Sequence, residues 1–144
     1  MEISGEYRLE APREEVWARL FDPEVLQRCI PGCKELTQTG ENSFDARVQL
    51  KIGPVSATFA ATVEIRDIDA PASCRLVGKG NGGIAGFAKG ECRVKLAEDE
   101  GATILTYSAD TEIGGKIAAL GSRLMQATSK KLADQFFLSF STPG

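Results

Sequence analysis

Four cysteines are the residues of this sequence best suited to bind a metal or to form disulfides: Cys29, Cys33, Cys74 and Cys92. The first two flank a Pro-Gly pair and resemble half of a zinc site. A structural zinc site needs four ligands, however, and the sequence has no histidine to complete the set. The other two fall at inward positions of predicted strands, where cysteine packs as a small apolar side chain. We therefore expect structural cysteines and no metal.

Acid–base catalysis would need two titratable side chains within hydrogen-bond reach of each other inside a pocket. Tyr7, Tyr107 and Thr111 fall on the inward-facing register of predicted strands. The acidic residues considered for this role fall on the outward-facing register: Asp45, Glu64 and Glu91. Because histidine, the commonest general base, is also missing, we expect no catalytic residue and no cofactor.

A Gly-x-Gly-x-x-Gly pattern occupies residues 78–83. A dinucleotide-binding loop of this kind must follow a strand and open a helix in a parallel unit. Here the segment after Gly86 has the pattern of another strand, so we expect a flexible hairpin and no nucleotide. Glycine tolerates the backbone conformations that such a loop requires.

The whole sequence, residues 1–144, is predicted to form one domain, since no linker or repeat interrupts it. The net charge of −3 argues against nucleic-acid binding. No apolar run approaches the ~20 residues needed to span a bilayer. The first residues, Met1 and Glu2, carry acid where a signal peptide carries base. We expect a cytoplasmic protein, in which thiols stay reduced.

Alternating apolar and polar residues predict antiparallel strands with one buried face over residues 44–52 and 55–66, joined by a turn at Gly53-Pro54. Further strands are expected over 3–9, 74–78, 88–96 and 103–113. Pro12 and Asp22-Pro23 predict the starts of two short helices after the first strand. A long C-terminal helix is expected over 116–140, with this apolar stripe: Ile117, Leu120, Gly121, Leu124, Thr128, Leu132 and Phe136. The result is an α+β helix-grip fold, with a curved sheet of about seven strands wrapped around the last helix.

The inward positions at mid-strand carry unusually small side chains: Ala46, Ala57, Ala61, Ala88, Gly90, Cys92 and Ala109. Small residues that face a helix leave either a close contact or a hollow, and normal packing density requires large residues against small ones. We favour a hollow that holds an apolar ligand. The predicted lining is Val48, Phe59, Ala61, Cys92, Tyr107, Leu120, Gly121, Leu124, Met125 and Thr128, and the predicted mouth is the loop with Gly82, Gly83, Ile84 and Phe87.

Four segments give the chain a resemblance to the G-subunit family of carbon monoxide dehydrogenase, within the superfamily that includes START domains, polyketide cyclases and the birch-pollen (Bet v 1-like) allergens. They are Asp22-Pro23 through Cys29-Ile30-Pro31-Gly32-Cys33; Ile52-Gly53-Pro54-Val55; Gly86-Phe87-Ala88-Lys89-Gly90; and Gly114-Gly115-Lys116-Ile117-Ala118 running into Gly121-Ser122-Arg123-Leu124. Each segment is weak alone, but all four occur in the family's order.

The resemblance implies a helix-grip domain with an apolar cavity and a non-enzymatic role beside a molybdenum hydroxylase of the carbon monoxide dehydrogenase type. It further implies peripheral contact with the cytoplasmic membrane and handling of quinone. Family members often carry a longer C-terminal tail that contacts the membrane, whereas this sequence stops at Gly144. We therefore do not expect stable anchoring by such a tail.

Basic residues at seven-residue spacing, Lys116, Arg123 and Lys130, are expected on the helix face opposite the apolar stripe. They would form either a solvated face or a patch for anionic lipid or an acidic partner. Two further hypotheses stay open beside the carrier of quinone or lipid. One is a polyketide cyclase or dehydratase, which rests on superfamily kinship alone. The other is a ligand-free assembly factor with a solid core.

Overall fold

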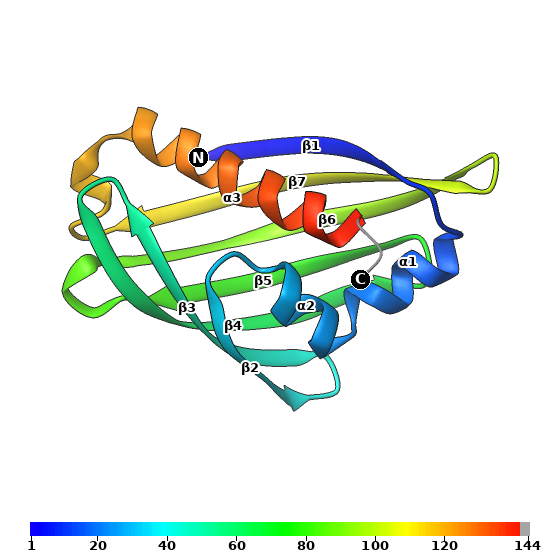
Figure 1. Cartoon of the computed structure of the whole chain (residues 1–144), viewed down its shortest axis with the longest axis horizontal. Helices are drawn as coiled ribbons and strands as arrows, with labels where there is room; N and C mark the ends of the chain where they lie inside the picture. Colours follow the sequence, from blue (N-terminus) through cyan, green and yellow to red (C-terminus); the bar gives the residue numbers. More distant parts are fainter. Residues whose placement is uncertain (142–144) are drawn as a thin grey trace.

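A computed structural model describes residues 1–141 and shows one antiparallel sheet covered on its concave face by helices (Figure 1). The strands lie in the order β1-β7-β6-β5-β4-β3-β2. Their bounds are β1 (Glu2–Leu9), β2 (Cys33–Gly40), β3 (Ser43–Ile52), β4 (Val55–Asp69), β5 (Ser73–Asn81), β6 (Phe87–Asp99) and β7 (Ala102–Gly114). The helices are α1 (Arg13–Leu20), α2 (Pro23–Cys29) and α3 (Ser122–Ser141), with 3₁₀ turns η1 (Gly83–Ala85) and η2 (Ala118–Leu120). The predicted helix-grip fold is confirmed.

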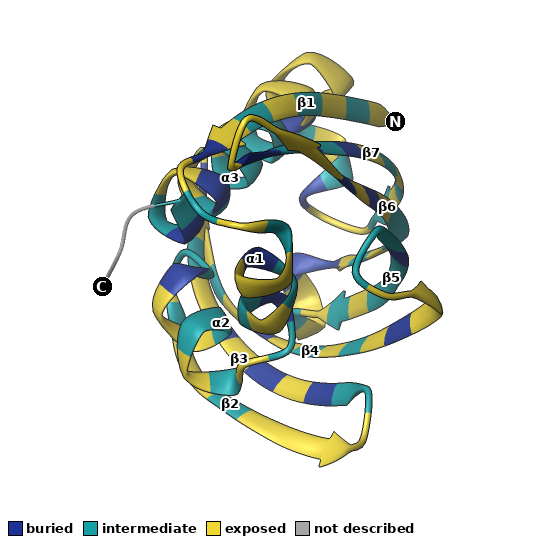
Figure 2. Cartoon of the chain, turned by 90° about the vertical axis from the view of Figure 1, so that its right-hand side faces the viewer, coloured by how far each residue is buried: buried dark blue, intermediate teal, exposed yellow. Residues whose placement is uncertain are grey.

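Strands β2 to β7 form a meander, and β1 pairs with β7 at the other end of the chain. The predicted inward register is also confirmed: Ile3 lies opposite Ala109, and Ala61 lies between Ala46 and Gly80. Figure 2 shows the resulting alternation of buried and exposed residues along the strands. Such alternation leaves one face of the sheet in water and turns the other toward the helices.

The two short helices begin where the sequence predicts. The Asp22 carboxylate accepts a hydrogen bond from the Glu24 backbone N–H at 3.0 Å, and Pro23 occupies the first turn, where its missing N–H costs nothing. Pro12 precedes α1, whose first turn carries acidic residues that suit the positive end of the helix dipole. The buried Val16 and Leu20 fasten α1 to the sheet.

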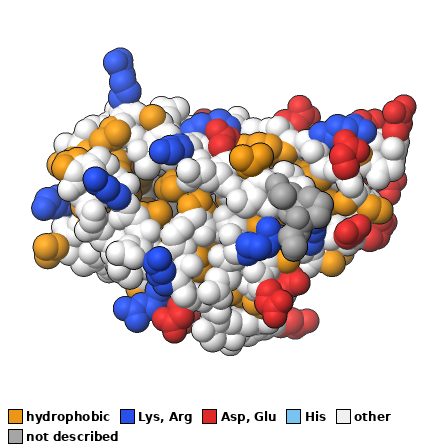
Figure 3. All heavy atoms as spheres, viewed as in Figure 1, with side chains coloured by type: hydrophobic (Ala, Val, Ile, Leu, Met, Phe, Trp, Pro, Cys, Tyr) orange, Lys and Arg blue, Asp and Glu red, His pale blue; other side chains and the backbone are white. Residues whose placement is uncertain are grey.

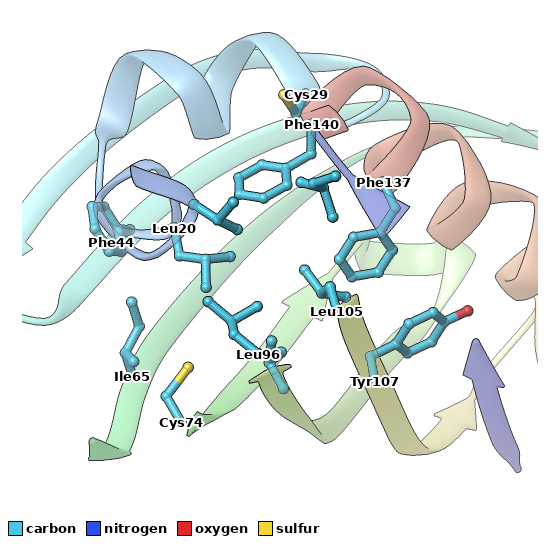
Figure 4. Packing of buried hydrophobic residues seen from close by; sticks show 13 residues of the cluster. Leu20, Cys29, Phe44, Ile65, Cys74, Leu96, Leu105, Tyr107, Phe137 and Phe140 are labelled. Atoms are coloured by element: carbon cyan, nitrogen blue, oxygen red, sulfur yellow. The ribbon is translucent and has the colours of Figure 1, made fainter. Parts of the chain in front are cut away.

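Buried apolar residues form two separate clusters. The larger, here called the α1–α2 cluster, lies beneath the two short helices and the C-terminal half of α3. Figure 4 shows Phe137 and Phe140 of α3 near Leu105 of β7 in this cluster. The smaller, here called the η1–η2 cluster, consists of Ile52, Val55, Phe59, Ala85, Ile117 and Met125. The residues at the middle of the concave face are not among the buried members of either cluster.

The last helix differs from its prediction. It begins at Ser122, not Lys116, because the chain first makes the turn η2 and then passes Gly121 at φ +105°. This break changes the phase of the helix. Its buried residues are Met125, Phe137 and Phe140, whereas Leu124, placed in the predicted stripe, is 37% exposed. At 1.5 Å per residue the helix is about 30 Å long.

No helix among residues 1–141 has the length and apolar character that a bilayer-spanning segment requires. The expectation about the C-terminal tail bears on residues 142–144, which lie outside the described part of the chain.

Candidate functional site

A hollow of about 360 Å³ occupies the concave face between the two core clusters. Its floor belongs to the inward positions of four neighbouring strands, β4 to β7. The inward-facing lining residues are Ala61, Val63, Leu76, Gly78, Gly80, Ala88, Gly90, Cys92, Ala109 and Thr111. These residues are half-buried, although they sit in the middle of a face whose two ends are fully buried. Only Thr111 among them carries a polar side-chain oxygen.

Steric need does not explain all of the small residues here. A Cβ atom added to Gly90 would lie 2.4 Å from the Asp110 carbonyl oxygen, so that glycine is required by the backbone. At Gly78 and Gly80 an added Cβ would find its nearest neighbours at 3.5 and 3.9 Å, which are ordinary contacts. Neither of these two glycines has a positive φ. A Cβ atom would therefore fit at both positions, and its absence makes the hollow wider.

A larger depression of about 690 Å³ lies across the outer face of the sheet. Several of its charged lining residues already pair with acids or bases on the sheet, as Arg66 does with Glu64 at 2.9 Å and Lys89 with Glu112 at 3.4 Å. We place the candidate site on the concave face, where the lining is apolar.

Two of the predicted lining residues, Ala61 and Cys92, lie in the wall of the hollow. Burial raises the pKa of the Cys92 thiol to about 12 and that of Cys74 to about 11. Both thiols are therefore neutral near pH 7 and behave as apolar groups. All four cysteines are free.

The other predicted lining residues surround the hollow at varying distance. Phe59 and Met125 belong to the η1–η2 cluster, and Leu120 packs against it. Val48 is buried on β3, and Thr128 is half-buried on α3. These positions stay predictions for ligand contact.

Three predicted residues lie elsewhere. Gly121 is exposed and ends η2, and Leu124 lies over Gly53. Tyr107 is buried in the α1–α2 cluster, where its ring stacks on Phe137 with centroids 4.8 Å apart.

The predicted mouth loop forms the turn η1 at one end of the sheet. Gly83 adopts φ +66°, and Ile84 is 93% exposed. Phe87 is 41% exposed and begins β6. Gly82 packs directly on Phe59, since an added Cβ would lie 2.7 Å from the phenylalanine ring. The loop is thus fixed at its base and apolar at its tip.

A polar network that the sequence analysis missed joins α3 to β1 and β7. The Tyr7 hydroxyl donates to the Asp134 carboxylate. The Lys130 ammonium group donates to the same carboxylate at 2.8 Å and to the Tyr107 hydroxyl at 3.3 Å. The spacing of Lys130 and Asp134, four residues apart on one helix, was the available signal. The inward register of the two tyrosines alone did not reveal their partner.

This network is unsuited to proton transfer near neutral pH. Burial, together with the bond to Asp134, raises the pKa of Tyr7 to about 12. The bonds from Lys130 and Tyr7 lower the pKa of Asp134, and the bond to Asp134 raises the pKa of Lys130. A general acid or base works best when its pKa lies near the working pH. The network instead holds each group in its ordinary charge state and fastens the helix to the sheet.

The three basic residues predicted to share a helix face do not do so. Lys116 precedes η2 and therefore lies outside α3, because the helix starts six residues later than expected. Arg123 is exposed at the start of α3. Lys130 is half-buried and committed to Asp134 and Tyr107.

Comparisons with known proteins bear on the fold and the family of the chain. A conserved protein from Geobacillus kaustophilus has a crystal structure that matches with a TM-score of 0.91 and 36% identity, over 98% of this chain and 93% of that one. A START superfamily protein from Mycobacterium smegmatis matches with a TM-score of 0.66 and 16% identity, over 93% and 92% of the two chains. The Zhui aromatase/cyclase from Streptomyces sp. R1128 matches with a TM-score of 0.65 and 12% identity, over 98% and 91%.

The last two likenesses show the fold alone, given their low identity. A search of curated proteins finds no match. The sequence profile of the family described as the G subunit of carbon monoxide dehydrogenase (CoxG) matches residues 5–143, which is nearly the whole chain. The chain therefore belongs to the CoxG family of carbon monoxide dehydrogenase.

Proposed function

We propose that this protein binds an isoprenoid quinone or a similar lipid in the hollow of the concave face, as a non-enzymatic accessory protein of a molybdenum hydroxylase of the carbon monoxide dehydrogenase type. The observation that carries the proposal is the apolar hollow between two buried clusters, which has glycine at positions 78 and 80 although a Cβ atom would fit at both. Family membership supports the accessory role and the dehydrogenase as its partner.

The hollow suits the proposed ligand in size and chemistry. Its volume of about 360 Å³ lies within the usual range for small-molecule pockets, roughly 300–1,000 Å³. Alanine, glycine and neutral cysteine residues form much of its floor, so one face of a flat ring system would lose water against apolar groups of the sheet. The Thr111 hydroxyl, which donates to the Met1 carbonyl at 3.4 Å, is the polar side-chain group among the inward-facing lining residues.

Titration of the purified protein with a short-chain quinone tests the binding directly. Saturable binding at one site, weakened by filling the hollow, is the expected result. Absence of binding for quinones and for fatty-acyl lipids alike would refute the proposal. Co-purification of the affinity-tagged protein with subunits of the dehydrogenase from its own host tests the accessory role separately.

The enzyme hypothesis is less well supported. The tyrosines that face inward contact Asp134 and Lys130, whose pKa values are shifted away from neutrality. The cyclase among the similar structures is 12% identical and shares the fold only. A solid-core assembly factor is disfavoured by the hollow itself.

A further inference from the structure

Several segments that are distant in sequence meet at one end of the molecule, here called the η1–η2 end. The Ile117 backbone N–H donates to the Ala85 carbonyl at 2.8 Å and so joins the two 3₁₀ turns. Leu124, in the first turn of α3, lies over Gly53 in the β3–β4 turn. Phe87 lies over the last residue of β7, where Gly114 leaves it room. The end is therefore one surface built from three stretches of the chain: the β3–β4 turn, η1 with the start of β6, and the stretch from the end of β7 through η2 to the start of α3.

This surface exposes an unusual share of the large apolar side chains. Five such residues are exposed among the described part of the chain, and three of them lie here: Ile84 at 93%, Phe87 at 41% and Leu124 at 37%. Ile84 stands at the tip of a loop whose base is fixed, so its exposure does not result from loose packing. Clustered exposed apolar residues mark surfaces that bind something.

The charges at this end are mainly basic and unpaired. Lys51, Lys116 and Arg123 are exposed, and no ion pair with another described residue involves any of them. Two acids lie nearby. Glu112 is paired with Lys89, and Glu2 borders a groove that Arg123 also borders.

The opposite end of the molecule is acidic. Its β6–β7 hairpin carries Glu98, Asp99 and Glu100, and α1 adds Glu14 and Glu15. Asp99 pairs with Arg8 and Glu98 pairs with Arg13, so the excess of acid comes from the other three residues. In Figure 3 the left end of the view shows mainly Lys and Arg side chains, and the right end shows mainly Asp and Glu side chains with some Lys and Arg among them. Such a charge distribution turns the molecule in the field of an anionic surface, with the basic end foremost.

We propose that the η1–η2 end docks on a bilayer that contains anionic lipid. Ile84 enters the acyl region, Phe87 and Leu124 lie at its boundary, and Lys51, Lys116 and Arg123 contact the headgroups. Exposed apolar residues and unpaired basic residues at the same end suit this interface, since each basic residue near the surface adds attraction to anionic lipid. This inference gives the proposed carrier a location at the membrane and an orientation on it. Only the part that concerns ligand entry rests on the proposed function.

Ligand entry follows from the position of the hollow. Its lining residues Gly80 and Ala88 lie on either side of the docking loop in sequence, each within four residues of Ile84. Docking in this orientation brings the near edge of the hollow to the phase in which a long-chain quinone dissolves.

Sedimentation with lipid vesicles tests the docking. The full chain is mixed with vesicles of phosphatidylcholine alone, or of equal parts phosphatidylcholine and phosphatidylglycerol. We expect binding to the mixed vesicles that weakens as salt rises, since salt screens exposed charges. Ile84→Ser, and separately Lys116→Glu combined with Arg123→Glu, should each lower the partition coefficient at least about tenfold.

Matched controls carry the same changes at other exposed sites. Arg93→Glu combined with Lys95→Glu alters charge on the outer face of β6, and Ile68→Ser removes an apolar residue that is 42% exposed on β4. These variants should bind within about twofold of the unaltered protein. Equal loss in control and test variants would overturn the proposal. The proposal would also be overturned if the η1–η2 end bound the dehydrogenase and the protein bound no vesicles, because the surface would then belong to a protein partner.

Quinone titration without vesicles separates the two proposals. Variants of the η1–η2 end should bind quinone as the unaltered protein does. Vesicle binding without quinone binding would refute the proposed function and leave the docking surface standing, and the reverse result would refute the docking alone.

Discussion

Replacing Ala61 by leucine should stabilise the ligand-free protein, because the side chain points into the hollow. Ala61 lies on the concave face between Ala46 and Gly80, both small. Leucine adds three carbon atoms, and each fully buried carbon contributes about 0.8 kcal/mol, or about 2 kcal/mol together. Since the site is half-buried, about 1 kcal/mol is the expected gain in the free energy of unfolding. A packed core would instead lose about 1–3 kcal/mol on the same change.

Urea denaturation of the ligand-free protein measures this difference, and its sign decides between the two descriptions. The neighbouring Ala60 faces outward and is exposed, so Ala60→Leu is the matched control and should change stability by less than about 0.5 kcal/mol. In the same samples, Ala61→Leu should weaken quinone binding at least about tenfold, which corresponds to about 1.4 kcal/mol. Clear destabilisation by Ala61→Leu with no effect of Ala60→Leu would show that the hollow is filled by the protein itself.

Three further predictions concern the packing of β1 against β7, the polar network of α3 and a thiol in the hollow. Gly5→Ala should destabilise the fold by about 1–3 kcal/mol, since the new Cβ would lie 2.6 Å from the Tyr107 ring. Gly80→Ala should not destabilise it, because the nearest neighbour of the new Cβ would lie at 3.9 Å. Thermal unfolding of the two variants measures the difference. Folding raises the pKa of Tyr7 from 10.0 to about 12, so its protonated form contributes stability that is lost as the pH rises from about 10 to 12. Tyr7→Phe should therefore flatten the plot of melting temperature against pH over this interval. An unchanged slope would contradict the assignment. Cys92, neutral and half-buried in the hollow, should react slowly with a maleimide at neutral pH, and more slowly when quinone is bound. Peptide mass mapping measures both rates. Equal rates with and without quinone would mean that the quinone binds elsewhere.

Much of the fold could be predicted from alternation and turn residues. The strict pattern through Phe44 and Ile65 specifies one wet and one buried face, and antiparallel pairing follows from it. Pro12 and Asp22-Pro23 mark the helix starts through their backbone chemistry. Each of these signals depends on residues close together in the chain, so it can be identified from the sequence alone.

The start of the last helix was harder to predict because the apolar residues Ile117, Leu120 and Leu124 continue a helical spacing across a break. Only Gly121, with its positive φ, ends the first turn and shifts the phase of the residues after it. A glycine in a helical pattern is also tolerated within helices, so its presence alone does not locate a break.

The small inward residues on the strands can be identified by period-two spacing, which is why the predicted lining includes Ala61 and Cys92, two residues in the wall of the hollow. Their contact with a ligand stays a prediction. The contribution of α3 depends on its phase and on long-range contacts. Asp134 was missed because its partner Tyr7 lies at the other end of the chain, and nothing local to either residue reveals the pairing.

Alanine methyl NMR during titration with quinone tests the central claim most directly. Ala61, Ala88 and Ala109 line the hollow, whereas Ala60 and Ala97 are exposed on the other face of the same sheet. A quinone held in the hollow should shift the first three methyl signals in a saturable way and leave the last two unchanged. Shifts confined to the outward methyl groups, or no saturable shift at all, would contradict the account.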